Sequence, residues 1–356
     1  LRTWLRGPML VALGSTAAAI LMLTATELSV VAMLTARDET AWFALANTVW
    51  CAASLVGGWI YGAARRPPPT AVLLGLLAAR ILLGDFTITI PDFFRIITGT
   101  KIPVASFIVM ESKLPAALAG TLAGVAFGAA GSTFQTMLRN PLASPDVLGV
   151  TLGASTAALG SSILFGWSGT AMSLAALGGS LAVAMLIHLV GGRSDSASHR
   201  MILIGLGIAA ALQSIVQWLL MRANIHQAQD AMVWLTGSLN SPSWSGIGRL
   251  ALVTVIALPV LLALARSLRL VELGADAATA LGANVARTRL ALMGIAVLLA
   301  ATAASVTGPI AFVSLLAGPI ARRLSGGRPS IPLAALVGAC IVLGADYLAN
   351  YLVPGD

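Results

Sequence analysis

The chain has 356 residues, of which 58% are hydrophobic and only 10% are charged, and its mean hydropathy is +0.93. Soluble domains carry about 25% charged residues, so this composition excludes an ordinary soluble enzyme and requires a lipid bilayer as the solvent. The formal net charge of +8 fits basic membrane loops better than nucleic-acid binding.

About eleven apolar stretches can be recognised, and a membrane span needs roughly 20 apolar residues. We therefore predict an all-α polytopic transmembrane helical bundle. These stretches use nearly the whole length, which leaves no segment for a nucleotide-binding or soluble catalytic domain. The expected spans are 8–33, 41–62, 70–90, 113–138, 147–165, 170–191, 201–221, 247–265, 290–306, 309–321 and 331–352.

The distribution of arginine predicts the orientation, because short cytoplasmic loops carry an excess of Lys and Arg. If the loop at Arg139 is cytoplasmic, alternation places ten of the twelve arginines from Arg139 onward on that side. Only Arg222 and Arg249 fall outside. Arg65 and Arg66 also fall inside, in agreement.

The first 80 residues differ in character from the remainder. Glu27 is an expected intramembrane carboxylate, and it is either a remnant of proton coupling or a helix-end residue. We expect the chain to combine two segments of different origin that meet within 70–85. The expected domains are therefore 1–82 and 83–356. The segments similar to the start of the C-terminal half of a major facilitator carrier are Thr24–Ser29, Ala44–Asn47, Gly57–Gly62 and Arg65–Pro67.

A proline-punctuated hinge, Arg139–Val150, separates two long apolar segments. Pro141 and Pro145 cannot extend a helix, and the residue before each is pushed to extended geometry, as at Asn140. Together with the small-residue run Gly128–Leu138, the hinge resembles the signature of FecCD-type permeases. These proteins are membrane subunits of bacterial ABC importers for iron–siderophore complexes, haem and vitamin B12.

The loop 266–289 is long for a membrane connection and holds an Ala-rich helical run that ends at a glycine. Read by itself, it is a short helix across the cytoplasmic mouth or a solvated loop helix without a partner. The loop is similar to the family's coupling helices, which dock into a cleft on the ATP-binding subunit. The resemblance assigns ATPase coupling to Glu272, Gly274, Asp276, Leu281, Gly282 and Asn284.

Gly308 and Pro309 break a helix, so 309–321 is expected to be a half helix inside the bundle. The family has Pro-His where this chain has Gly318-Pro319, so any role of that His does not transfer. No span between 113 and 330 carries Asp or Glu in its middle, which favours coupling to ATP in a partner subunit over proton coupling.

The resemblance also implies two contacts with an extracytoplasmic substrate-binding protein, which family members make through arginines. Here Lys113-Leu114-Pro115-Ala116 keeps only the charge of Lys113, and Asn350 stands four residues after Asp346 in place of the second Arg. Lys and Asn cannot copy the bidentate recognition of a carboxylate by Arg. Docking is therefore expected to be weaker, rebuilt through other residues or lost.

The resemblance covers roughly 83–356 without the family's last helix, so a fragment or a fusion is expected. It implies an iron–siderophore permease subunit in the bacterial cytoplasmic (inner) membrane. Its partners would be ABC ATPase subunits, a substrate-binding protein, a second permease copy or paralogue, and the lipid bilayer. Cys51 and Cys340 show no ligand spacing, so neither a cofactor nor a metal site is expected. The alternatives are a major facilitator type secondary carrier and a non-functional fusion relic.

Overall fold

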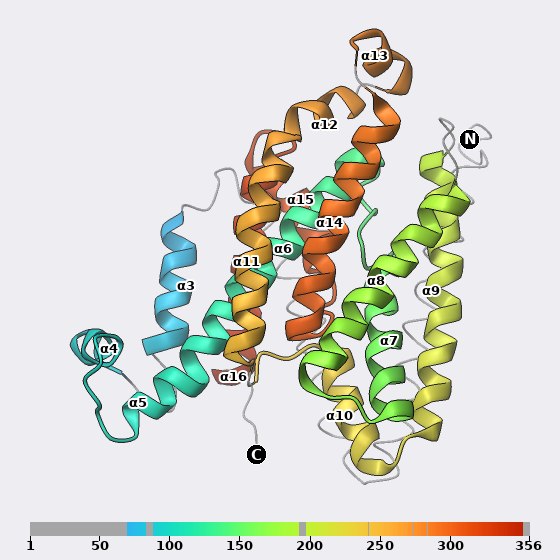
Figure 1. The fold of residues 1–356 in the computed structure, drawn as a ribbon. Coiled ribbons are helices and arrows are strands. Elements are labelled where there is room, and N and C mark those ends of the chain that lie inside the picture. The colour runs from blue at the N-terminus through green and yellow to red at the C-terminus, as the bar shows by residue number, and fades with distance from the viewer. Residues whose placement is uncertain are drawn as a thin grey trace, which may run out of the picture. The chain divides into compact units, whose positions relative to one another are not determined.

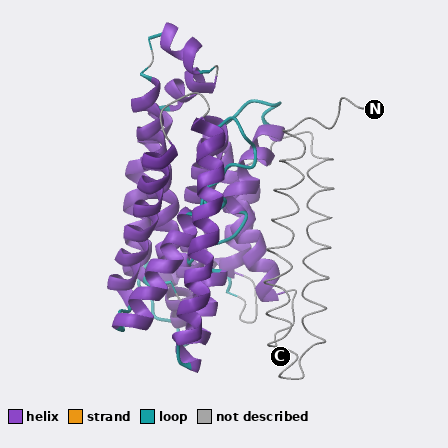
Figure 2. Cartoon of the chain, turned by 90° about the vertical axis from the view of Figure 1, so that its right-hand side faces the viewer, coloured by secondary structure: helices purple, strands orange, loops and turns teal. Residues whose placement is uncertain are grey.

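The structure, a computed structural model, describes residues 70–82, 88–191, 197–240, 242–272, 274–282 and 284–351. These residues belong to one compact unit, Arg65–Asp356, and within them the chain forms helices and turns but no strand (Figures 1 and 2). The expected spans 8–33 and 41–62, together with Glu27 and Cys51, lie outside the described residues. The predicted all-α membrane bundle is confirmed for the described part.

Six helices in the described part are long and apolar enough to cross a membrane. The first is a continuous run of α5 (Ala105–Phe107), a π-helical stretch η1 (Ile108–Lys113) and α6 (Leu114–Met137). This run has 33 residues and lies obliquely in the bundle, as a span longer than the bilayer requires (Figure 1). The other five are α8 (Gly169–Gly191), α9 (Ala197–Arg222), α11 (Trp244–Ala263), α14 (Val285–Thr307) and α16 (Ile331–Tyr351).

Three shorter helices complete the bundle: α3 (Thr70–Leu82), α7 (Val150–Phe165) and α15 (Val313–Leu324). Every span expected between 113 and 352 has a helical counterpart. The expected span 70–90 is helical over Thr70–Leu82, while 83–87 lie outside the described residues. Its last residue, Ile90, opens a separate helix.

Four short helices lie at the two ends of the bundle (Figure 1). At the end where α6 finishes are α12 (Ala265–Glu272) and α13 (Ala275–Ala280). At the opposite end are α4 (Ile90–Ile97) and α10 (Ile225–Thr236). Arg266 and Arg269 are on α12, whereas Arg222 ends α9 just before α10, as the orientation from the arginine pattern requires.

Neither α4 nor α10 was predicted, although both carry local start signals. Thr89 caps α4, accepting from the backbone N–H of Asp92, and Pro91 occupies the first turn. Asn224 and Gln227 form a reciprocal capping box at the start of α10. Both helices are too short to span a bilayer, so a search for apolar stretches passes over them.

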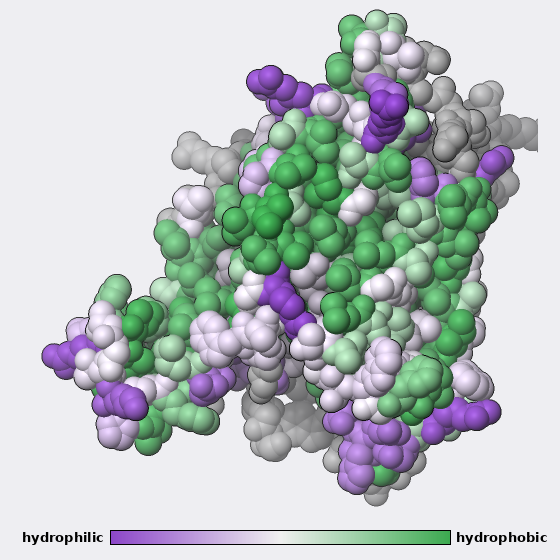
Figure 3. All heavy atoms as spheres, viewed as in Figure 1, coloured by the Kyte–Doolittle hydropathy of each residue, from purple (hydrophilic) through white to green (hydrophobic). Residues whose placement is uncertain are grey.

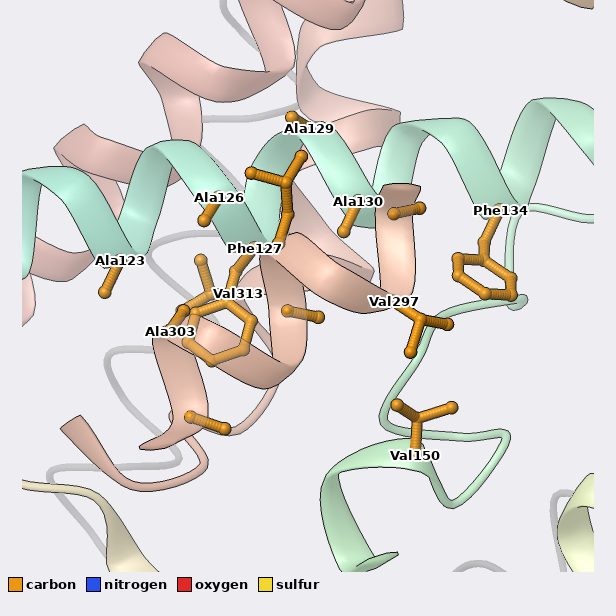
Figure 4. Packing of buried hydrophobic residues seen from close by; sticks show 14 of the residues in the cluster. Ala123, Ala126, Phe127, Ala129, Ala130, Phe134, Val150, Val297, Ala303 and Val313 are labelled. Carbon is orange, nitrogen blue, oxygen red and sulfur yellow. The ribbon is translucent and has the colours of Figure 1, made fainter. Parts of the chain in front are cut away.

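Helix α6 is the centre of the core and packs along α16, α14 and α15. Its glycines allow backbone-to-backbone contact: a Cβ on Gly128 would lie 2.2 Å from the carbonyl oxygen of Ala334 on α16. In Figure 4, Phe127 points toward Ala303 of α14 and Val313 of α15. Packing of small residues replaces the hydrophobic effect as the force that joins membrane helices.

Apolar side chains also cover much of the surface, with hydrophilic residues gathered mainly at the two ends (Figure 3). The exposed apolar side chains on α8, α9 and α11 include those of Leu189, Leu203, Met221, Leu252 and Val255. In water such a surface would aggregate, whereas in a bilayer the lipid chains cover it at no cost.

Candidate functional site

The hinge begins with the cap that ends α6. The N–H of Asn140 donates to the carbonyl of Gln135 at 3.0 Å, and that of Arg139 donates to the carbonyl of Thr136 at 3.3 Å. These two bonds form a Schellman motif, and Arg139 takes the left-handed conformation at φ 50°. The Asn140 side chain then accepts from the N–H of Leu142 at 2.9 Å, which starts the turn through Pro141.

The hinge is divided into an exposed rim and a buried plug. Arg139, Pro141 and Leu142 are exposed and Asn140 is half-buried, whereas the segment Ala143–Pro145 is buried and Ser144 has no exposed surface. In Figure 1 this connection runs from the end of α6 down into the bundle to reach α7.

The buried part of the hinge pairs its polar backbone groups within the protein. The N–H of Ala143 donates to the carbonyl of Asn140 at 3.1 Å, and the carbonyl of Ser144 accepts from the N–H of Leu148 at 3.1 Å. The N–H of Val150 donates to the carbonyl of Pro145 at 2.9 Å. Irregular backbone can be buried only when its donors and acceptors are hydrogen-bonded in this way. These bonds therefore stabilise the plug in its buried position.

Gln135 at the end of α6 bridges two other segments. Its Nε2 donates to the carbonyl of Pro141 in the hinge at 2.8 Å and to that of Leu315 in α15 at 2.9 Å. Pro319 lies inside α15 four residues after Leu315 and has no N–H to donate to that carbonyl. Gln135 therefore supplies a donor that the proline in α15 cannot.

The glycine that replaces the first residue of the family's Pro-His pair has a packing role. A Cβ on Gly318 would lie 1.9 Å from Oε1 of Gln135, so the glutamine side chain passes directly over this residue. A Cβ on Gly131 would lie 1.8 Å from the carbonyl oxygen of Ser314. Glycine at both positions lets α6 and α15 approach closely enough for the Gln135 bridge.

Asp146 carries a carboxylate into the same region. Ser314 of α15 donates its hydroxyl to Oδ2 of Asp146, and Thr151 at the start of α7 also bonds to this carboxylate. Desolvation raises the pKa of Asp146 to about 6, although the two hydroxyl bonds act in the opposite direction. The ionised group thus prefers water to its place in this structure.

The coupling loop contains two helices instead of the one expected. Glu272 ends α12, whereas Asp276 lies in the first turn of α13, the Ala-rich helix. The two helices meet at Gly274, whose φ of 112° and ψ of 158° are accessible essentially to glycine alone. Gly282 follows α13 with φ 82°, in agreement with the expected glycine stop.

The hinge and the coupling loop lie next to each other. A Cβ on Gly274 would be 3.7 Å from a guanidinium nitrogen of Arg139, although 135 positions separate the two residues in sequence (274 − 139). Leu281 is 61% exposed at this end of the molecule. Asn284 instead caps α14, since its side chain accepts from the N–H of Arg287 at 3.1 Å.

The break at Gly308 and Pro309 lies between α14 and α15. Gly308 has φ 70°, and a Cβ there would lie 2.4 Å from the carbonyl of Trp234 in α10. The carbonyl of Thr307 accepts from the N–H of Ser238 at 2.8 Å. The half helix α15 begins at Val313, four residues later than expected, because the chain needs a turn after Pro309.

The two residues expected to dock a binding protein lie toward the other end of the molecule. Lys113 is only 5% exposed within the π-helical stretch, and Asn350 donates to both the carbonyl and the carboxylate of Asp346. Arg80 of α3 makes an ion pair with Asp346, and both side chains are almost fully buried. Sequence reasoning missed Arg80, which lies in the stretch where it placed the join.

Within the described residues no group of three His, Cys, Asp or Glu side chains is arranged to hold a metal ion. The candidate site consists of helix ends, a partly buried hinge and a helix pair at one end of the bundle.

Residues 70–356 match the model of the FecCD transport family, and the chain belongs to this family. It is 38% identical over 270 residues to the ferric enterobactin transport system permease protein FepG of Escherichia coli (strain K12), covering 76% of this chain and 82% of the relative. It is 34% identical over 302 residues to the permease protein FepD of the same system, covering 81% and 88%. Members of the family are transport subunits rather than enzymes.

A solved structure has the same fold. It is described as an inward-facing conformation of a putative metal-chelate type ABC transporter, and it superposes with a TM-score of 0.71 at 24% identity. The match covers 80% of this chain and 89% of the other. At this identity the likeness supports the fold of the bundle alone.

Proposed function

We propose that this chain is the permease subunit of a bacterial inner-membrane ABC importer that takes up iron–siderophore complexes. Family membership and relatives named for ferric enterobactin transport support the proposal. The structural observation that carries it is the proximity of the hinge to the coupling loop, because a Cβ on Gly274 would lie 3.7 Å from a guanidinium nitrogen of Arg139. Because the two segments adjoin, a movement of the loop would be felt at the hinge.

The driving force would come from separate ATPase subunits that bind the α12–α13 pair. The exposed Leu281 beside a short helix is the kind of apolar anchor that a cleft on a partner can accept. Gly274 fixes the angle between the two helices, and Gly282 ends the second one. We assign the coupling role to this pair, with Glu272, Asp276 and Asn284 flanking it.

Two further partners belong to the proposal. A substrate-binding protein would dock at the opposite end, near α4 and the end of α16, where Lys113 and Asn350 were expected to act. Because Lys113 is buried and Asn350 bonds to Asp346, exposed neighbours such as Glu111 and Lys101 are better placed for direct contact. The second partner is another permease copy or a paralogue.

The division of the chain also remains a proposal. Residues 70–356 match the family, and α3 is joined to α16 through Arg80 and Asp346. We therefore place the join before α3 rather than at 82/83, and assign a different origin to the residues that precede it.

The coupling role predicts the effect of alanine at two glycines. Gly274→Ala is expected to weaken ATPase binding on the order of tenfold, because the ε-region backbone costs a non-glycine residue about 1–3 kcal/mol. Gly282→Ala, at a positive φ in open space, is expected to have a smaller effect. The measurement is co-purification with candidate ATPase subunits and titration of their ATP hydrolysis.

Gly207→Ala is the matched control for this experiment, since Gly207 lies within α9 and a methyl group added there would meet no atom within 4 Å. It is expected to leave ATPase binding unchanged. If no ATPase subunit co-purifies with the unaltered chain, the importer function is wrong. If Gly274→Ala binds as tightly as the control, the α12–α13 pair is not the coupling surface.

A further inference from the structure

The end of α6, the hinge and α15 are joined at one place by two partly buried side-chain contacts, those of Gln135 and of Ser314 with Asp146. Gln135 donates to carbonyls of both the hinge and α15, and Ser314 of α15 donates to Asp146 of the hinge. Gln135 is 7% exposed and Ser314 is fully buried. Nothing in the family match or in the relatives' names assigns a role to these three residues.

Ordinary packing does not explain this arrangement. The carbonyl of Leu315 lacks its usual donor within α15, because Pro319 has no N–H. One of the two N–H groups of Gln135 donates to this carbonyl instead. Its other donor is used by the hinge at Pro141. Gln135 therefore connects the hinge to α15 at the point where α15 lacks one of its own backbone hydrogen bonds.

Asp146 is half-buried as a residue, and its carboxylate bonds to the hydroxyls of Ser314 and Thr151. Its raised pKa means that burial disfavours the ionised form, which the hydroxyls of Ser314 and Thr151 only partly offset. A neutral amide would fill the same space and accept the same hydroxyl without that penalty. The charge on Asp146 consequently weakens the contact between Asp146 and Ser314. If the hinge separated from α15, water could solvate this carboxylate.

We propose that Gln135, Asp146 and Ser314 form a lock that holds the hinge plug Ala143–Pro145 against α15, and that the charge of Asp146 keeps this lock easy to open. The three are positioning residues, since none needs to touch substrate. The proposal rests on the proposed function only for what passes when the lock opens. The lock itself is a property of this chain.

Thiol labelling of the plug tests the lock. Ser144→Cys is introduced into the full chain with Cys51 and Cys340 replaced by alanine, and a membrane-impermeant thiol reagent is applied to inverted vesicles at pH 8. Ser144 is fully buried, so labelling of this parent should be slow. Ser314→Ala and Gln135→Met should each raise the rate on the order of tenfold, because the first removes the hydrogen bond to Asp146 and the second removes both hydrogen bonds of Gln135.

Asp146 distinguishes a lock from a merely structural contact. Asp146→Ala should speed labelling, whereas Asp146→Asn should slow it below the parent rate, because the amide keeps the acceptor and loses the charge. Ser161→Ala is the matched control: this buried serine on α7 donates only within its own helix, to the carbonyl of Ala158, and its loss should leave the rate unchanged. Circular dichroism and size-exclusion chromatography check that each variant is folded.

Two outcomes would overturn the proposal. One is a parent-like rate in both Ser314→Ala and Gln135→Met. The other is faster labelling in Asp146→Asn, which would leave the carboxylate with a structural role only. Labelling needs no ATPase, binding protein or substrate, so a failure of the importer function would show in co-purification and leave this result intact.

Discussion

Gly131→Ala is expected to lower the free energy of unfolding by about 3 kcal/mol or more, because the added methyl group has no space to enter. Its Cβ would lie 1.8 Å from the carbonyl oxygen and 2.5 Å from the carbonyl carbon of Ser314. Both atoms are backbone, so no flexible side chain can move aside. Helix α15 must shift away from α6, which also breaks the Gln135 bridge. Thermal unfolding in detergent measures the effect.

Gly294→Ala provides the comparison for this variant. Gly294 lies within α14, and nothing is found within 4 Å of a Cβ built on it. Alanine there should leave stability unchanged or raise it by about 0.5–1 kcal/mol, as expected for a glycine in the middle of a helix. If Gly131→Ala unfolds at the same temperature as Gly294→Ala, the close approach of α6 and α15 is wrong.

Arg80→Ala is expected to have the second large effect, a loss of about 3–5 kcal/mol, because it removes the cation that faces a buried carboxylate. The side chains of Arg80 and Asp346 are only 7% and 10% exposed, so water cannot replace the lost partner. The pair also joins α3 to α16, and its loss should free α3 first. Unfolding in detergent, together with proteolysis near residues 70–82, measures both results.

Arg95→Ala tests whether burial is the cause. Arg95 faces Asp92 at 3.7 Å on α4, but these side chains are 67% and 38% exposed. Its replacement should cost about 0.5 kcal/mol or less, as for other surface pairs. A double-mutant cycle with Asp346→Asn should recover most of the loss in Arg80→Ala, and additive losses would contradict a direct pairing.

Much of the bundle could be predicted because each membrane span is determined by its own stretch of sequence. Each span needs its own run of apolar residues, and the limits of α8, α9, α14 and α16 follow the apolar limits within a few residues. The proline at 141 and the glycines at 282 and 308 could likewise be recognised as breaks, since their backbone preferences act at single positions. Helices α4 and α10 could not be predicted from apolar length, because both are too short to span a membrane.

The hinge shows the limit of that reasoning. Its prolines predict that a helix ends, but they do not tell that Ala143–Pro145 enters the bundle while Leu142 remains at the surface. Gln135 lies in an apolar run and resembles any helix-stabilising glutamine until Leu315, 180 residues away, is placed beside it. A proline inside the α15 segment was the available signal, since it leaves a carbonyl that requires a donor.

By itself the sequence determined the solvent, the spans between 113 and 352 and the family, because these depend on composition, on local apolar length and on motifs in single loops. Only the tertiary structure decided that Arg139 lies near Gly274, that Asp146 bonds to Ser314 and that Arg80 pairs with Asp346. The physical reason is distance along the chain. Contacts between distant helices depend on how small residues allow the backbones to approach, and no local pattern records that approach.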